Sequence, residues 1–384
     1  MEANGRTRRG VGLVAALVLA FAAVVVLHAD SAYATHVTCG DTITTDTVLD
    51  SDLIDCPNNG IIIGANGITL DLNGHMIDGD GQLVDPCPEG EFCDAGVFAD
   101  GHDGVTVMNG SLREFASGVA VGSARDVRLA GLLSTRNAFF GFFLFDVSQS
   151  VIRDSAGSRN PAPDGDGLGM FASHGNRVVD NEFARNALGI HVEDSTNNLI
   201  KGNLIAGTED GPGILVQADD NEMRGNDCRR NGICILVAKG DDNVVARNRV
   251  SGGGDGIAVE NGRRNLVIRN RVLDTGGTGI YLGLALPPIG GRSNVVRHNV
   301  VIGSGADAFK VTKNDHHSVL RQNVARGAGD DGFKVRSSTA KLADNLAVSN
   351  GDLGIQAAEG VIDGGGNRAS RNGDPRQCVN VVCT

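Results

Sequence analysis

The chain has 384 residues, of which 55 are Gly and none is Trp, and its formal net charge is -12. The high Gly content without a Gly-X-Y period excludes collagen, and 41% hydrophobic residues exclude a chain that is disordered by composition. The negative charge has the wrong sign for a general binder of nucleic acid or of anionic membranes.

Residues 1–34 predict a secretory signal peptide. Three Arg in the first nine residues precede an apolar run over 11–27, and Ala32-Tyr33-Ala34 is a small-x-small cleavage site. Because the apolar run is long, an uncleaved anchor is the alternative. No other segment is apolar enough to span a membrane. We therefore expect a secreted protein, extracellular or in the cell envelope, with no membrane contact after removal of the signal.

Eight Cys follow the signal peptide, which agrees with export to an oxidising compartment. They fall in near neighbours, and local pairing is the simplest arrangement. A zinc site is the alternative, but no Cys-x-x-Cys pair supports it. The expected disulfides are Cys39–Cys56, Cys87–Cys93, Cys228–Cys234 and Cys378–Cys383.

A repeat of about 23 residues organises the mature chain. Gly followed by an apolar residue recurs, for example at Gly189, Gly213, Gly232 and Gly256. Each unit holds short stretches with period-2 alternation, separated by Gly, Asn, Asp and Ser, and no stretch keeps a helical period. This predicts an all-β, single-stranded parallel β-helix of about 13 coils of 22–24 residues.

A second marker has the same period, since Asn recurs at matching positions such as Asn203, Asn226 and Asn248. We expect this Asn to tolerate a left-handed backbone at a tight bend and to bond the Asn one coil away in a ladder. The repeat therefore predicts four segments, namely the signal peptide (1–34), an N-terminal cap (35–66), the β-helix (67–375) and a C-terminal disulfide cap (376–384). Insertions between Gly67 and Gly96, over 160–166 and over 284–291 are expected to interrupt the regular coils.

The segments Cys39-Gly40-Asp41-Thr42-Ile43-Thr44 and Gly67-Ile68-Thr69-Leu70-Asp71-Leu72-Asn73-Gly74-His75 resemble those of secreted bacterial right-handed parallel β-helix proteins with pectate-lyase-like coils. The resemblance extends over about residues 38–375 and implies a right-handed β-helix. It does not define an activity, because the group includes lyases, epimerases, hydrolases, adhesive proteins and accessory proteins.

Alignment of the coils on Gly gives rows of outward residues. One row runs through Cys234, Ala258, Tyr281, Lys310 and Lys334, and a second contains Leu236 and Arg336. Two neighbouring coils have nearly matching text, Gly305-Ala306-Asp307-Ala308-Phe309-Lys310-Val311 and Gly329-Asp330-Asp331-Gly332-Phe333-Lys334-Val335.

These two coils are similar to the Ca²⁺-and-Lys arrangement of β-helix polysaccharide lyases, although no complete family motif matches. In such enzymes a cation on the uronate carboxylate acidifies the neighbouring proton, and a base removes it. The resemblance implies Ca²⁺ on Asp307, Asp330, Asp331 and Asp315, with Lys310, Lys334, Arg336 and His316 as catalytic candidates. The alternative is that Asp and Lys neutralise one another on a solvated face.

A strip of turn residues forms a further row, with Asp219-Asp220, Asp241-Asp242, Arg263-Arg264, Arg292-Ser293 and His316-His317. Ion pairing between coils is its simplest explanation. The two His are the exception, because they are able to act as acid or base. Together with Tyr281 and Lys313, His317 is expected to contact substrate.

Two functions remain open. The first is a polysaccharide lyase or epimerase directed at an acidic polysaccharide, with glycoside hydrolase less favoured because no Gly-His-Gly segment follows Gly329-Asp330-Asp331-Gly332. The second is a non-catalytic extracellular or envelope rod that binds a glycan or a protein. A metal-handling role, as in copper-associated periplasmic β-helix proteins, is third because the sequence lacks a Met or Cys ligand cluster. We expect a monomer that does not bind nucleic acid.

Overall fold

The computed structural model describes residues 36–82, 93–160, 165–208, 211–283 and 290–384. Every helix or strand within these ranges is a β-strand. The described residues accordingly contain no helix that could cross a membrane. The predicted all-β fold is confirmed.

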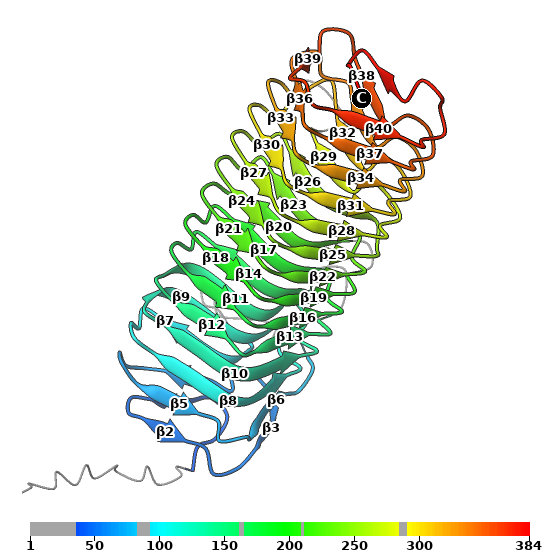
Figure 1. Cartoon of the computed structure of the whole chain (residues 1–384). Helices are drawn as coiled ribbons and strands as arrows, with labels where there is room; N and C mark the ends of the chain where they lie inside the picture. The colour runs from blue at the N-terminus through cyan, green and yellow to red at the C-terminus, as the bar shows by residue number, and fades with distance from the viewer. Residues whose placement is uncertain (1–35, 83–92, 161–164, 209–210, 284–289) are drawn as a thin grey trace, which may run out of the picture. The chain divides into compact units, whose positions relative to one another are not determined.

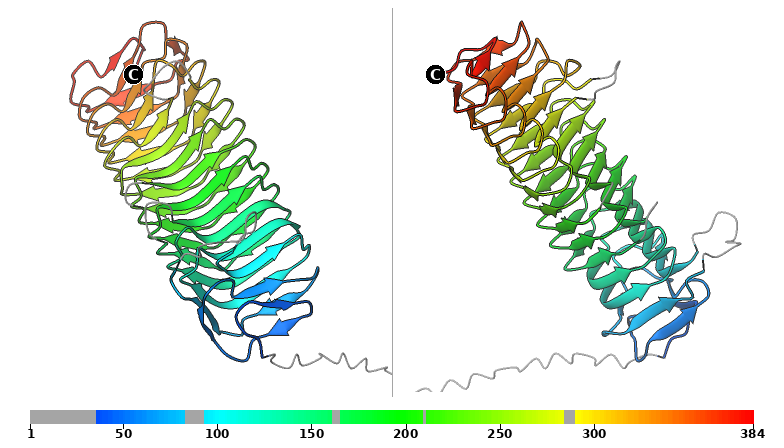
Figure 2. Two further views of the ribbon diagram at one scale, coloured as in Figure 1. Left: turned by 180° about the vertical axis from the view of Figure 1, so that it is seen from behind. Right: turned by 90° about the vertical axis from the view of Figure 1, so that its right-hand side faces the viewer.

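One face of the solenoid is a parallel sheet of fifteen strands, stacked in the order in which the chain makes them (Figures 1 and 2). Its strands are β1 (Asp41–Ile43), β4 (Ile61–Ile63), β7 (Ala95–Asp100), β9 (Ser117–Arg125), β11 (Phe140–Ser148), β14 (Asp166–Phe171), β17 (Leu188–Glu193), β20 (Pro212–Gln217), β23 (Ile233–Ala238), β26 (Asp255–Glu260), β29 (Ile280–Leu282), β32 (Phe309–Val311), β35 (Phe333–Val335), β38 (Ile355–Ala357) and β41 (Cys378–Val379). We call it the fifteen-stranded sheet. Strands β1 and β4 lie before residue 67, so the coil pattern already begins in the segment expected as the N-terminal cap.

The remaining strands form two further parallel rows. The first row is β2 (Thr47–Val48), β5 (Thr69–Asp71), β12 (Val151–Arg153), β15 (Arg177–Val179), β18 (Leu199–Lys201), β21 (Glu222–Arg224), β24 (Val244–Ala246), β27 (Leu266–Ile268), β30 (Val295–Arg297), β33 (Val319–Arg321), β36 (Lys341–Ala343) and β39 (Ile362–Asp363). The second row is β3 (Leu53–Cys56), β6 (Met76–Gly79), β13 (Ala156–Ser158), β16 (Glu182–Ala184), β19 (Leu204–Ala206), β22 (Asp227–Arg229), β25 (Arg249–Ser251), β28 (Arg271–Leu273), β31 (Val300–Ile302), β34 (Val324–Arg326), β37 (Leu346–Val348) and β40 (Arg368–Ser370). Two long strands, β8 (Thr106–Arg113) and β10 (Arg128–Thr135), belong to both rows.

Alternate side chains of every coil point into one continuous core. In the fifteen-stranded sheet Ile190 lies opposite Ile214, which lies opposite Ile235, and all three are fully buried. Neighbouring strands are about 4.8 Å apart, so these side chains stack on one another along the solenoid. Burial of such aliphatic stacks is the main source of stability for this fold.

The Gly marker fails at one coil. Strands β20 and β23 pair Ile214 with Ile235 and Leu215 with Leu236, so Cys234 and not Gly232 is the equivalent of Gly213. The outward residues of this coil are therefore Leu236 and Ala238, not Cys234 and Leu236 as the sequence alignment had placed them. The alignment was wrong because it followed Gly232, whereas the disulfide-bonded Cys234 occupies the Gly position.

The predicted Asn ladder is confirmed. The Asn203 amide donates to Asn226 Oδ1 over 3.1 Å, and Asn226 in turn donates to Asn248 Oδ1 over 3.0 Å. The expectation of a left-handed backbone at these Asn is wrong, because the residue with positive φ is the preceding one, such as Gly225 or Arg247. The Asn side chain closes the bend from inside, and its neighbour makes the backbone turn.

Three of the four predicted disulfides are present, namely Cys39–Cys56, Cys228–Cys234 and Cys378–Cys383. The expected Cys87–Cys93 bond includes Cys87, which lies outside the described residues. Residues 83–92, 161–164 and 284–289, which belong to the three expected insertions, also lie outside them.

Candidate functional site

The Lys-Asp cluster lies on the outer face of the fifteen-stranded sheet, where β32 and β35 are neighbours. Phe309 pairs with Phe333 and Lys310 with Lys334. The two Phe rings stack inside the core with centroids 4.6 Å apart and planes inclined by 6°. Because side chains alternate along a strand, this buried pair holds the two Lys side by side on the outer face.

Lys334 lies among three carboxylates. Its Nζ is 2.9 Å from Asp330 Oδ2, 3.0 Å from Asp331 Oδ2 and 3.6 Å from Asp307 Oδ1. Lys310 makes a longer contact, 3.5 Å, with Asp307 Oδ2. The structure thus brings together five of the predicted site residues, which we call the lysine site: Asp307, Lys310, Asp330, Asp331 and Lys334.

Two of the carboxylates also hold the backbone of neighbouring coils. Asp331 is fully buried, and its Oδ1 accepts a hydrogen bond from the amide of Leu353 over 3.0 Å. Asp307 is 2% exposed and accepts one from the amide of Asp331 over 3.3 Å. These contacts fix both carboxyl groups in place, so the lysine site is preorganised.

Burial and charge act against each other at this site. Burial raises the pKa of Asp307 and of Asp331, and the nearby ammonium of Lys334 only partly offsets the effect. Burial also opposes the charge of Lys334, but its bonds to Asp330 and Asp331 outweigh this and raise the pKa of the ammonium group. Lys334 is therefore a permanent cation at neutral pH and a poor proton acceptor.

Tyr281 lies one coil away, directly opposite Lys310 in the register between β29 and β32. Burial, together with the charges of Glu260 and Asp255, raises the pKa of its phenol to about 12. Burial and the charge of Asp255 likewise raise the pKa of Glu260. Tyr281 therefore stays protonated at neutral pH and offers a hydrogen-bond donor beside the two Lys.

The other predicted site residues lie around this cluster. Lys313 and Arg336 are both exposed. Lys313 lies just after β32, and Arg336 lies just after β35. Asp315 is fully buried in the turn after β32, where its Oδ2 accepts a hydrogen bond from Asn294 over 3.1 Å. Burial raises the pKa of its carboxyl group. His316 and His317 are exposed in the same turn, with ring centroids 6.5 Å apart. The backbone of His316 forms an isolated parallel β-bridge with the backbone of Arg292 in the preceding coil.

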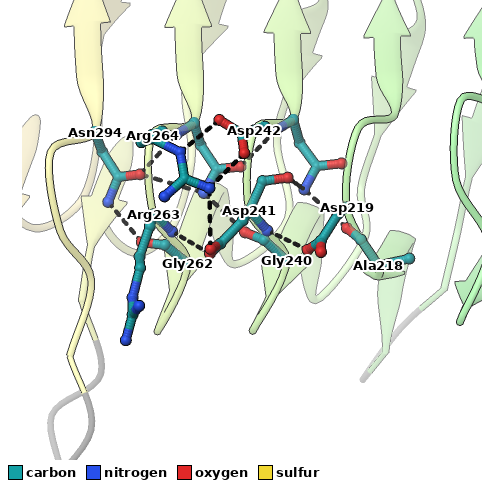
Figure 3. Close-up of polar contacts among 11 residues, drawn as sticks. Ala218, Asp219, Gly240, Asp241, Asp242, Gly262, Arg263, Arg264 and Asn294 are labelled. Atoms are coloured by element: carbon teal, nitrogen blue, oxygen red, sulfur yellow. Dashed lines mark hydrogen bonds and ion pairs between the residues drawn. The ribbon is translucent and has the colours of Figure 1, made fainter.

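The turn strip contains the ion pairs between coils that the sequence suggested. Asp241 Oδ1 accepts a hydrogen bond from the amide of Arg263, and Asp219 Oδ1 accepts one from the amide of Asp241 (Figure 3). Arg264 donates two hydrogen bonds to the carboxylate of Asp242, from Nε to Oδ1 over 2.8 Å and from Nη2 to Oδ2 over 2.5 Å. The side chain of Arg263 extends away from both carboxylates (Figure 3). These Asp have a structural role.

A His–Asp pair that was not predicted from the sequence lies nearer the N-terminus on the same face. His191 Nδ1 lies 3.4 Å from Asp166 Oδ2, and its Nε2 lies 3.3 Å from Gln217 Oε1. Burial opposes protonation of the ring, but Asp166 outweighs it and raises the pKa of His191. The available signal was the outward position of His191, two residues after the repeated Gly at Gly189. Asp166 carried no such signal, because it lies just after an insertion where the alignment is least certain.

Aromatic residues surround this pair on the face. The rings of Phe140, Phe143 and Phe171 have centroids 4.8 to 6.0 Å apart, and Phe171 contacts His191 edge-on. Beyond them a groove of about 680 Å³ is lined by Phe98, Phe143 and Phe145, among other residues. The outer face is thus aromatic in its first half and charged in its second.

The stacked coils and the outward charged cluster define the class of the protein, a right-handed β-helix: residues 166–325 match the family described as a right handed beta helix region. A second family, described as periplasmic copper-binding protein (NosD), matches residues 33–226, about half of the chain. The chain belongs to the NosD family. This membership and the disulfides indicate an extracellular or envelope location.

Solved structures with the same fold include the A-module of the mannuronan C-5 epimerase AlgE6 from Azotobacter vinelandii. It is 14% identical, with a TM-score of 0.57, over 85% of this chain and 90% of that one. The DFA-IIIase of Arthrobacter chlorophenolicus A6 without its lid is 15% identical, with a TM-score of 0.47, over 68% and 66%. At 14% identity, the likeness to the AlgE6 A-module shows the fold alone. No curated protein matches the chain.

The described residues form no cluster of His and Cys for the copper that the family description names. Copper favours thiolate, thioether and imidazole ligands. Every Cys in the described part of the chain is disulfide-bonded. Of the four Met in that part, Met170 and Met223 are fully buried in the core, whereas Met76 and Met108 are partly exposed. In those same ranges one group of three or more His, Cys, Asp or Glu brings its ligand atoms within 4.8 Å of one another, and it consists of Asp307, Asp330 and Asp331. Carboxylate oxygens suit a hard cation such as Ca²⁺.

Proposed function

We propose that the chain is an exported β-helix protein that binds acidic polysaccharide at the lysine site, on the outer face of the fifteen-stranded sheet. The observation that carries this proposal is the register of Tyr281, Lys310 and Lys334 on three successive coils, beside the carboxylates of Asp307 and Asp330. Two ammonium groups and a phenol in a row offer donors to the hydroxyl and carboxylate groups of a sugar chain.

The finer proposal is a Ca²⁺-dependent uronate lyase or epimerase. Three carboxylates outnumber two ammonium groups at the lysine site, so an approaching uronate carboxylate meets net negative charge. A bound Ca²⁺ would remove this repulsion and acidify the proton beside the uronate carboxylate. Asp330 is its most accessible ligand, because its side chain is 45% exposed whereas Asp307 and Asp331 are buried.

The geometry divides the remaining roles. Lys334 stays charged and holds the carboxylates in place. Lys310, which makes one contact at 3.5 Å and is 32% exposed, is the less constrained of the two Lys and would take the proton from the sugar in its neutral amine form. Tyr281 remains protonated and is able to return a proton to the sugar or to its leaving oxygen.

The test is incubation of the mature protein with a panel of uronate polysaccharides and Ca²⁺. Absorbance of the unsaturated sugar reports a lyase, and NMR of the polymer reports an epimerase. We expect Lys310→Ala to abolish either signal, while Lys341→Ala, which removes an exposed Lys from β36, leaves it unchanged. Absence of product from every polymer would overturn the enzymatic version.

A non-catalytic glycan-binding rod is the second candidate. It is favoured by the way in which Lys334, Asp331 and Asp307 already neutralise and hold one another. Binding of a uronate polymer without product, weakened by Lys310→Ala, would support this version over the enzyme.

A further inference from the structure

A second charged surface lies on the other side of each coil, where the first row turns into the second. Arg247 and Arg269 occupy the left-handed position between the rows, with φ of 55° and 56°. In β25 and β28 Arg249 pairs with Arg271, and in β30 and β33 Arg297 pairs with Arg321. We call these six residues, which come from four consecutive coils, the arginine corner (for the strands, see Figure 1).

The charge of the arginine corner is partly compensated at one point, where Arg249 lies opposite Asp227 in the register between β22 and β25. Among the residues that the structure describes, none of its six guanidinium groups forms an ion pair, although the chain as a whole is acidic. Exposed Arg nearby do pair, as Arg224 does with Glu222 and Arg229 with Asp227. Arg249 lies close enough to help to lower the pKa of Asp227, but the hydrogen bond from Arg229 is the larger cause.

Two further observations indicate that this arrangement is unfavourable for folding. Arg297 Nε is buried and has no hydrogen-bond partner. Like charges directly opposite one another on neighbouring strands repel, and Arg249 with Arg271 and Arg297 with Arg321 are such pairs. The like-charged pairs lie at positions where other residues would avoid the repulsion, and they therefore point to a negatively charged ligand that neutralises them.

We propose that the arginine corner binds a strand of acidic polysaccharide. Its six Arg come from four successive coils that stack along the solenoid axis in steps of about 4.8 Å, which suits a linear polymer that carries one negative group on each sugar ring. Arg binds carboxylate and sulfate oxygens through two parallel N–H bonds. An exported location, indicated by the family and the disulfides, favours a polysaccharide over nucleic acid.

This inference shares a ligand class with the proposed function but none of its residues. The lysine site lies on the fifteen-stranded sheet, whereas the arginine corner lies on the other two rows. Variants of one surface therefore leave the other intact, and failure of either proposal is recognisable by itself.

The experiment measures binding of the mature protein to polygalacturonate and to alginate by calorimetry at several salt concentrations. We expect the triple variant Arg269→Gln, Arg271→Gln, Arg297→Gln to bind at least about tenfold more weakly, with a shallower dependence on salt. The matched control, Arg264→Gln with Arg376→Gln, removes two exposed Arg that are already ion-paired and should bind like the unaltered protein. Unchanged affinity of the triple variant would overturn the proposal, whatever Lys310→Ala does.

Two competitors identify the ligand class. Double-stranded DNA and vesicles of anionic phospholipid are tested against the same surface under the same salt conditions. Weaker binding of both than of the polysaccharide supports the proposal. If either binds as tightly through the same Arg, the surface recognises another class of polyanion and the assignment to polysaccharide is wrong.

A thermal melt distinguishes a binding surface from a structural one. Because Arg269 adds to the repulsion at the corner, Arg269→Gln should raise the melting midpoint of the free protein by about 1 °C or more. Added polygalacturonate should then raise the midpoint of the unaltered protein more than that of the triple variant. A lower midpoint for Arg269→Gln, combined with unchanged affinity, would show that the Arg serve the fold.

Discussion

Lys334 Nζ lies 3.0 Å from Asp331 Oδ2, and that carboxyl group is wholly buried. This pair affects both folding and binding. The fold requires the buried charge to be neutralised, whereas a binding site requires charge that a ligand can reach. Its consequences for stability and for metal binding are separable by mutation.

Replacement of Lys334 should destabilise the fold. Lys334→Met leaves Asp331 buried without its cation and removes a contact of Asp307, so we expect a loss of about 3 kcal/mol in the free energy of unfolding at neutral pH. Urea denaturation measures it, and Lys341→Met on the exposed face of β36 serves as control. Equal stability of the two variants would show that water reaches Asp331 and compensates the charge.

Calcium should stabilise the protein through Asp330. If Ca²⁺ binds the folded lysine site, its addition raises the melting midpoint, and Asp330→Asn removes most of that rise because the most accessible ligand has lost its charge. Differential scanning calorimetry with and without a chelator measures the effect, with Asp126→Asn on a distant turn as control. A rise that is equal in both variants would place the cation elsewhere.

The stability contributed by Asp315 should depend on pH in a defined direction. Burial raises the pKa of its carboxyl group above the unfolded value of 3.8, so its contribution to stability is fully present below that value and is lost as pH rises through the folded pKa. Asp315→Asn keeps an acceptor for Asn294 and removes the buried charge. We expect the variant to be more stable than the unaltered protein at pH 7 and the difference to shrink toward pH 4, as measured by urea denaturation at both pH values. A constant difference would mean that the carboxyl group does not titrate in this range.

Replacement of one Asn of the ladder should destabilise hydrogen bonds in two neighbouring coils. Asn226 donates to Ile200 O and to Asn248 Oδ1, and its own Oδ1 accepts from the backbone and side chain of Asn203. Asn226→Ala leaves several of these buried groups unpaired and should cost about 2 kcal/mol or more in the free energy of unfolding. Hydrogen exchange should show the amide of Asn203 losing protection. Asn73→Ala, in an exposed turn near the N-terminus, is the comparison and should leave exchange in the central coils unchanged.

The sequence was sufficient to predict the coil because two markers, Gly and Asn, repeat with one period and each has a physical reason to do so. The prediction failed where another residue takes the place of a marker. Cys234 occupies a Gly position because its disulfide with Cys228 uses the same space, and Gly232 then misled the alignment by two residues.

For the candidate site, the sequence could predict which residues lie near one another but not their contacts. Matching text on two coils was enough to bring Asp307, Asp331 and Lys334 together, because stacked coils place equal positions side by side. The sequence could not show that Lys334 lies among the carboxylates, since that depends on side-chain geometry. The contact of His191 with Asp166 could not be predicted, because Asp166 follows an insertion and no repeated Gly or Asn aligns it with the next coil.

The constant register has a consequence for how this protein can change in evolution. Asn203, Asn226, Asn248 and Asn270 make the same bonds to one another at separations of 22 or 23 residues. Duplication or deletion of one such unit would leave every remaining bond with an equivalent partner. The spacing along the axis between the aromatic groove, the arginine corner and the lysine site can thus be adjusted only in whole steps, each as long as one strand is wide.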